Sequence, residues 1–172
     1  PDFVVLHPSR GLLVLEVKDW KPETIAEIDR DSFTLHTERG RVTTANPIRQ
    51  ARDYAMEIVR LLQNDPTLCQ PSSDRRAGKL LMPWGFGVVL TNISRAQFEQ
   101  MELEAFLPSG NVICRDEMTE GADTEEFQKR LWDMFLLPFP CLLSLPQIER
   151  VRWHLFPQLR IQVQGDLLSA PA

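Results

Sequence analysis

Two carboxylates and a lysine near the start of the chain have the residue types and spacing of a metal-dependent phosphodiesterase site. Asp2 precedes one apolar run, and Glu16 and Lys18 end a second. Both runs are strand-like, and the turn between them ends in Gly11. This pattern predicts a β-hairpin in which Gly11 takes a positive φ angle.

The hairpin fixes which side chains face each other. With His7 opposite Gly11, counting back along the two strands sets Asp2 opposite Glu16. Side chains alternate along a strand, so Glu16 and Lys18 project from the same face. Directly opposed residues have Cβ atoms about 4.5–5.5 Å apart. We therefore expect the two carboxylates to lie close enough to share one cation.

The apolar pattern of the second strand predicts that Glu16 is a buried charge. The strand is apolar on both faces until Glu16, and a buried charge is costly unless it is paired or bound to a metal. Mg²⁺ accepts one or two protein carboxylates and keeps several waters, one of which can become a nucleophile. Asp2 and Glu16 are therefore candidate ligands, the Val17 carbonyl is a candidate third, and Lys18 is placed to stabilise phosphate charge. The alternative is a solvated strand end with an ordinary ion pair.

These residues carry a resemblance to a known superfamily. Pro1-Asp2 and Glu16-Val17-Lys18 resemble the PD-(D/E)xK nucleases, and Asp2 to Val5, Gly11 to Trp20 and Asn46 to Tyr54 resemble a NERD (nuclease-related) domain. The match is closest to the version that precedes UvrD/Rep-type helicase modules. The resemblance implies a restriction-endonuclease-like α/β fold, with a mixed β-sheet core flanked by helices. It also implies Mg²⁺ or Mn²⁺, a DNA substrate, and a helicase module in cis or in trans. In the superfamily a further acidic ligand often comes from a helix before the first motif strand, an element that is absent here or lies outside this sequence.

A helix is predicted over residues 47–62, opened by an asparagine cap and a proline. Gln50 and Tyr54 lie one turn apart on it and point the same way. The pair resembles the Q-x-x-x-Y motif of RecB-like nucleases, which implies that this helix packs beside the metal site and that Gln50 assists catalysis and substrate placement. Arg49 and Arg52 are further candidates for nucleic-acid contacts. The alternative is a polar helix surface with a half-buried core tyrosine.

The rest of the chain predicts alternating strands and helices. Residues 20–44 predict a small β meander at the edge of the sheet, and residues 64–79 predict a mobile loop. A buried strand is predicted at residues 85–90, followed by a helix that ends near residue 105. This order favours a mixed sheet flanked by helices.

Clustered prolines predict a domain boundary. We expect a nuclease-related domain over residues 1–136 and a linker and tail over residues 137–172, with a short helix at 149–156 and an extended piece at 159–163. We expect such a tail to dock on another module, and the resemblance to a NERD domain implies that this module is a helicase.

Composition is typical of a globular protein and restricts the partners. The formal net charge is −5 and the pI is near 5.2, which argues against a protein that coats duplex DNA. Three cysteines without metal-ligand spacing fit a reducing compartment. The chain shows no phosphate-binding loop, no charged leader and no apolar run long enough to cross a membrane. We therefore expect a cytoplasmic protein with no membrane partner.

Two hypotheses follow from the sequence. The first is a divalent-metal-dependent DNA nuclease that works in DNA processing or repair as part of a helicase-nuclease protein. The second is a nuclease-like fold without turnover, which binds DNA or a helicase and regulates it. The intact motif favours the first, and the acidic composition favours the second.

Overall fold

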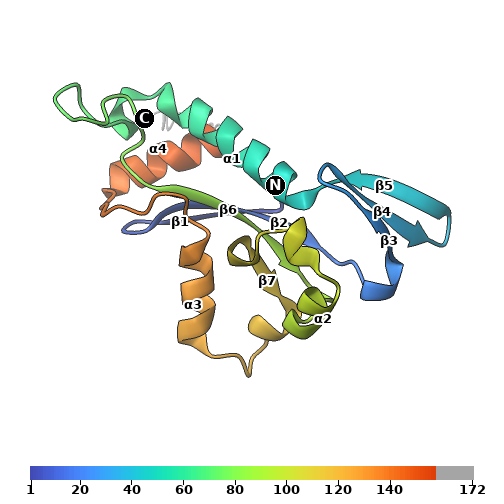
Figure 1. The fold of residues 1–172 in the computed structure, drawn as a ribbon. Coiled ribbons are helices and arrows are strands. Elements are labelled where there is room, and N and C mark those ends of the chain that lie inside the picture. The colour runs from blue at the N-terminus through green and yellow to red at the C-terminus, as the bar shows by residue number, and fades with distance from the viewer. Residues whose placement is uncertain (158–172) are drawn as a thin grey trace, which may run out of the picture.

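The structure is a computed structural model that describes residues 1–157, in which the strands form two sheets (Figure 1). The main sheet contains, in spatial order, β1 (Phe3–His7), β2 (Gly11–Lys18), β6 (Trp84–Leu90) and β7 (Val112–Cys114).

A smaller antiparallel sheet and four α-helices complete the described fold. The smaller sheet contains β3 (Ile25–Ile28), β4 (Ser32–Thr37) and β5 (Gly40–Ala45). The helices are α1 (Pro47–Gln63), α2 (Arg95–Gln100), α3 (Thr124–Asp133) and α4 (Leu145–Leu155).

The predicted hairpin is confirmed with its register. β1 and β2 are antiparallel, and His7 pairs with Gly11. Gly11 has a φ of 110°, and a Cβ atom there would lie 2.1 Å from the carbonyl oxygen of Pro83. Glycine is therefore required at this position both for its conformation and for the close approach of the next strand.

The main sheet is mixed, as predicted. β2 is antiparallel to β1 but parallel to β6, and β6 is parallel to β7. Figure 1 shows α1 and α4 on one side of this sheet and α3 on the other. Leu12 packs with residues of α1 and α4. The next residue, Leu13, packs with residues of α3 and of the segment that follows α3. The predicted mixed sheet flanked by helices is thus confirmed.

The meander forms, but its predicted place at the edge of the main sheet is wrong. β3, β4 and β5 make a sheet of their own, which Figure 1 shows projecting beyond the main sheet. Phe33 of β4 is buried and its ring centroid lies 5.0 Å from that of Trp20. The meander is therefore attached by side-chain packing and not by strand pairing.

Three predicted boundaries or loops differ in the structure. α2 ends at Gln100, because Glu102 takes a left-handed conformation with φ 52° that interrupts the helix. The segment 64–79 is anchored and not simply a surface loop, since Leu68 is fully buried and the backbones of Cys69 and Leu80 form an isolated antiparallel β-bridge. α4 begins at Leu145, earlier than expected, where Ser144 forms a capping box with Gln147.

The beginning of the predicted tail packs on the preceding residues. Leu143 and Val151 are buried in a cluster that includes Leu62 and Leu68. The backbone of Leu143 also donates a hydrogen bond to the Pro8 carbonyl at 2.9 Å. The division into residues 1–136 and 137–172 stays a prediction, and the predicted extended piece at 159–163 lies outside the described residues.

α4 is fixed to the end of α1 through one buried carboxylate. Asp65 is 3% exposed and accepts hydrogen bonds from Arg150 Nε at 2.7 Å and from the Thr67 hydroxyl at 2.7 Å. His154 Nε2 lies 2.9 Å from the same carboxylate. The hydrogen bond with His154, followed by those from Thr67 and Arg150, holds the pKa of Asp65 well below its usual range.

Asp65→Asn should therefore lower stability in a pH-dependent way. A depressed folded-state pKa contributes stability that is present above the unfolded-state pKa, about 3.9, and that is lost as the pH falls toward the folded value. We expect Asp65→Asn to lower the Tm clearly at pH 7, and the difference from wild type to shrink below about pH 4. Asp53→Asn is the matched control, because Asp53 contacts Arg52 at 3.3 Å on the exposed face of α1 and such pairs contribute little. Equal Tm changes in the two variants would contradict this role for Asp65.

Candidate functional site

Glu16 and Lys18 project from β2 onto the face that α1 covers. Val14, two residues earlier on the same face, packs against Ala51 and Ala55 of α1. Glu16 is 7% exposed, and Lys18 Nζ donates a hydrogen bond to its Oε1 at 2.8 Å. The alternation along β2 therefore places both side chains on one face, with the carboxylate buried and paired.

Asp2 lies beside this pair at the end of the hairpin. The last paired residues are Phe3 and Leu15, and the Asp2 N–H donates to the Leu15 carbonyl at 3.2 Å. The same register continued by one residue sets Asp2 opposite Glu16. The Asp2 carboxylate turns toward the β2 backbone, where its Oδ2 accepts a hydrogen bond from the Val17 N–H at 2.7 Å.

The Val17 carbonyl lies on the same edge of β2. In an antiparallel ladder the N–H and C=O of one residue point toward the same neighbouring strand. Because the Val17 N–H reaches Asp2, its carbonyl also points to the β1 side. One backbone oxygen and the Asp2 carboxylate are thus available along a single strand edge next to Glu16.

The packing of α1 sets Gln50 level with Glu16. Leu12 packs with Val59 and Leu62, and Val14 packs with Ala51 and Ala55, so α1 runs antiparallel to β2. Two strand residues advance about 6.6 Å, which equals four to five residues of helix. Glu16 therefore lies at the height of the first two turns of α1. Gln50 Oε1 is buried there and has no hydrogen-bond partner among residues 1–157.

Gln50 and Tyr54 belong to the flank of α1 that faces β1. Further along this flank, Glu57 and Ile58 line a cavity of about 430 Å³ together with Asp2. Helical spacing of three and four residues sets Gln50 and Tyr54 on the same flank. Tyr54 is 37% exposed, so its ring and hydroxyl are accessible beside the Asp2 end of the hairpin.

Arg49 and Arg52 lie on the opposite flank of α1. They line a separate cavity of about 340 Å³ with Arg30 and Phe86. Arg49 is paired with Asp31, and Arg52 lies 3.3 Å from Asp53. The sequence placed both arginines next to Gln50 and Tyr54, and in the structure the arginines line a cavity that Gln50 and Tyr54 do not line.

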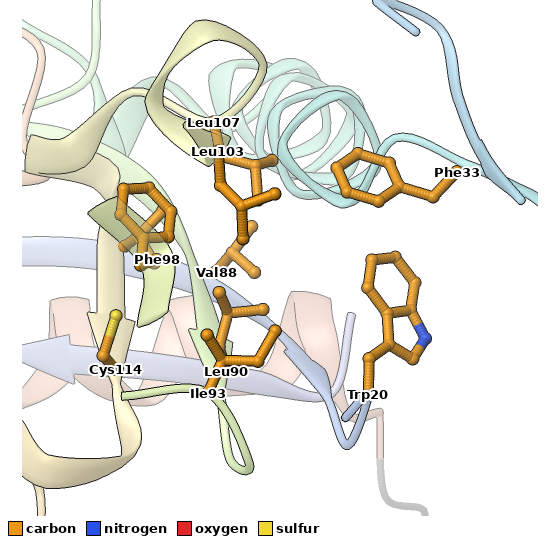
Figure 2. Packing of buried hydrophobic residues seen from close by; sticks show 10 residues of the cluster. Trp20, Phe33, Val88, Leu90, Ile93, Phe98, Leu103, Leu107 and Cys114 are labelled. Carbon is orange, nitrogen blue, oxygen red and sulfur yellow. The ribbon is translucent and has the colours of Figure 1, made fainter. Parts of the chain in front are cut away.

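Trp20 supports the motif lysine from outside the strand. The centroid of the Trp20 ring lies 5.8 Å from Lys18 Nζ, which is within the range of a cation–π contact. Figure 2 shows Trp20 next to Phe33 at one side of a buried cluster that also contains Val88 and Leu90 of β6. Trp20 thereby connects the small sheet, the main sheet and Lys18.

Trp20→Ala is expected to destabilise the protein by about 3–5 kcal/mol, the usual effect of truncating a buried aromatic side chain. Trp20 is 9% exposed, whereas Trp153 on α4 is 51% exposed. Trp153→Ala should therefore change the free energy of unfolding much less. Urea denaturation followed by circular dichroism measures both, and equal losses would contradict the anchoring role of Trp20.

Two residues of the Asp2 cavity were not anticipated from the sequence. Glu57 reaches it from α1 and His154 from α4. Glu57 could have been found from its helical spacing to Tyr54. His154 could not, because the docking of α4 depends on its distant contact with Asp65.

The donor set at the hairpin fits a hard cation such as Mg²⁺ or Mn²⁺. Asp2, Glu16 and the Val17 carbonyl offer oxygen atoms, which these ions prefer. Among the residues that the structure describes, no group of three or more His, Cys, Asp or Glu side chains could hold a metal ion. A site here would consist of two carboxylates, a backbone oxygen and water, a composition that Mg²⁺ accepts.

The mixed sheet with helices on both faces is consistent with a restriction-endonuclease-like fold. Residues 1–76 match the family model of the nuclease-related domain, NERD. The predicted resemblance to a NERD domain is therefore confirmed over this part of the chain, which contains every site residue predicted from the sequence. No curated protein and no solved structure matches the chain. In residues 1–157, no helix is both long and apolar enough to span a membrane.

Proposed function

We propose that this chain is a divalent-metal-dependent DNA nuclease that hydrolyses phosphodiester bonds. One observation carries the proposal: a buried Glu16–Lys18 pair stands beside Asp2 at the end of a hairpin, within a match to a nuclease-related domain. A glutamate buried at the end of an apolar strand is costly, and binding a cation offsets that cost.

Asp2, Glu16 and the Val17 carbonyl would hold Mg²⁺ or Mn²⁺. Such an ion, when bound, lowers the pKa of a coordinated water and neutralises charge on the scissile phosphate. Asp2 is already oriented by the Val17 N–H at 2.7 Å, so little side-chain freedom remains to be lost on binding.

Lys18 and Gln50 would act on the reacting groups. Lys18 is held by Glu16 and by the Trp20 ring, and its ammonium group can stabilise the charge that develops on the phosphate. Gln50 Oε1 is buried without a partner among the described residues, and such atoms normally have one. It can accept a hydrogen bond from the attacking water and so orient it.

The remaining predicted residues would place the DNA. Tyr54 offers an exposed ring and hydroxyl on the flank of α1 next to Asp2. Arg49 and Arg52 would bind phosphates on the other flank. A substrate that contacts both flanks would have to cross the N-terminal half of α1. We include in the proposal a role in DNA processing or repair, a helicase module in cis or in trans, and a cytoplasmic location.

Two observations favour the second candidate, a nuclease-like module without turnover that binds DNA or regulates a helicase. Lys18 and Glu16 already neutralise each other, and the described residues include no cluster of three acidic or other metal-binding side chains. An ion pair of this kind can be stable without any metal.

A cleavage assay separates the two candidates. Labelled single-stranded, duplex and branched DNA would be incubated with Mn²⁺ or with EDTA, using the wild-type chain and Asp2→Ala. The proposal predicts cleavage that requires Mn²⁺ and is lost in the variant. DNA binding without Mn²⁺-dependent cleavage would support the second candidate instead.

A further inference from the structure

A second concave region lies at the other end of β2 from the candidate nuclease site. Two adjoining cavities, of about 530 and 410 Å³, share Pro83, Pro138 and Phe139 in their walls. We refer to these cavities together as the Pro138 groove. Trp84, which lines the groove, pairs with Leu12 of β2. Leu12 is four positions before Glu16, so the groove and the candidate nuclease site are about 13 Å apart along the strand.

The groove is strongly apolar and open to solvent. The walls of the larger cavity include Val59 of α1, Met82, and Leu136 and Leu137 of the segment after α3. Leu136 is 52% exposed and Leu137 is 79% exposed. Large apolar side chains that border a cavity of this size are typical of an interaction site and not of an ordinary surface.

All charged residues that line the groove are cationic. They are Arg10, Arg76 and Lys79, although the chain as a whole has a formal charge of −5. Arg76 lies 3.9 Å from Asp74, but within residues 1–157 neither Arg10 nor Lys79 has an ion-pair partner. The groove therefore combines an apolar floor with a positive rim, which is complementary to an acidic ligand with apolar side chains.

The aromatic residues of the groove favour a protein ligand over nucleic acid. Single-stranded nucleic acids bind such surfaces by stacking bases on open aromatic faces. Here the Arg76 guanidinium lies 3.9 Å from the ring centroid of Phe139, and that of Arg10 lies 5.1 Å from the Trp132 ring. The rings of Phe139 and Trp132 thus each already have a cation over them. Of the other two aromatic residues of the groove, Phe135 is buried and Trp84 is partly buried, and much of the remaining wall is aliphatic or proline.

We propose that the Pro138 groove binds a short segment of a partner protein that has large apolar side chains flanked by aspartate or glutamate. The apolar side chains enter the two cavities as anchors, and the carboxylates contact Lys79 and Arg10 at the rim. This binding site is separate from the candidate nuclease site and does not depend on catalysis.

The test uses fluorescence anisotropy with labelled synthetic peptides of about 16 residues, which carry leucine at helical spacing. One peptide has glutamate at the other positions, and its matched partner has lysine there. The variants of the full chain are Leu137→Asp and Lys79→Glu, with Leu142→Asp as the control. Leu142 is 82% exposed and belongs to the same segment, but it does not line either cavity. All these side chains are exposed, and circular dichroism confirms that each variant is folded.

The expected result is saturable binding of the glutamate peptide only. Leu137→Asp and Lys79→Glu should each weaken it by about tenfold or more, the scale of losing one interface anchor or one charge pair, and Leu142→Asp should leave it unchanged. Absence of binding, equal binding of the lysine peptide, or equal weakening by Leu142→Asp would overturn the proposal. Displacement of the peptide by oligothymidine would show that the groove is a nucleic-acid site instead.

Discussion

Glu16→Gln is expected to lower Mn²⁺-dependent DNA cleavage by about 10³-fold, because a bound divalent ion contributes several kcal/mol of transition-state stabilisation and each 1.4 kcal/mol is tenfold in rate. Glutamine keeps the size of the side chain but removes the charge that would bind the ion. Glu16 is buried and contacts Lys18 at 2.8 Å, so the amide can still accept a hydrogen bond from the lysine and the fold should be retained.

Glu57→Gln is the matched control for this variant. Glu57 lines the cavity next to Asp2 but is exposed on α1, and it is not among the proposed ligands. Cleavage by Glu57→Gln should stay close to that of wild type. If both variants, or neither, lost activity, Glu16 would have no special role in binding the ion.

Lys18→Ala is expected to lower cleavage by about 10²-fold or more, the usual effect of removing one preorganised electrostatic contact. Lys18 is proposed to act on the phosphate and not on the metal, so affinity for Mn²⁺ should remain largely intact. The comparison of single-turnover cleavage with Mn²⁺ affinity separates these two effects. Lys18 also pairs with Glu16, so its removal can lower the stability of the fold. The Tm of the variant is therefore measured first, and cleavage is assayed well below it.

Lys21→Ala is the corresponding control. Lys21 follows the motif by three residues and is exposed, so its loss reports on general attraction to DNA. Unchanged cleavage by a folded Lys18→Ala protein would reject the proposed role. A parallel loss of Mn²⁺ affinity would instead indicate that Lys18 only supports the carboxylates.

The hairpin could be predicted from the sequence because its determinants are local. Gly11 sets the turn, strand alternation sets the faces, and both are encoded within a few residues. The same holds for the start of α1, where Asn46 accepts a hydrogen bond from the Ile48 N–H and a proline follows. Such signals specify an element and its register through residues that are close in the sequence.

The parts that could not be predicted depend on contacts between distant residues. The meander was misplaced because its attachment comes from the packing of Trp20 on Phe33 and not from strand pairing. The distant neighbours of Arg49 in its cavity, Arg30 and Phe86, follow from how α1 crosses the sheet, which helical periodicity alone does not determine. The place of His154 near Asp2 follows from its contact with Asp65, 89 residues earlier in the sequence.

Calorimetry of Mn²⁺ binding to the full chain is the decisive measurement for a metal site formed by Asp2 and Glu16 at the end of the hairpin. We expect about one Mn²⁺ to bind per chain, the number expected for a site with two protein carboxylates. Binding should be clearly weaker in both Asp2→Ala and Glu16→Ala. Equal Mn²⁺ binding by the wild-type chain and both variants would contradict the existence of this site.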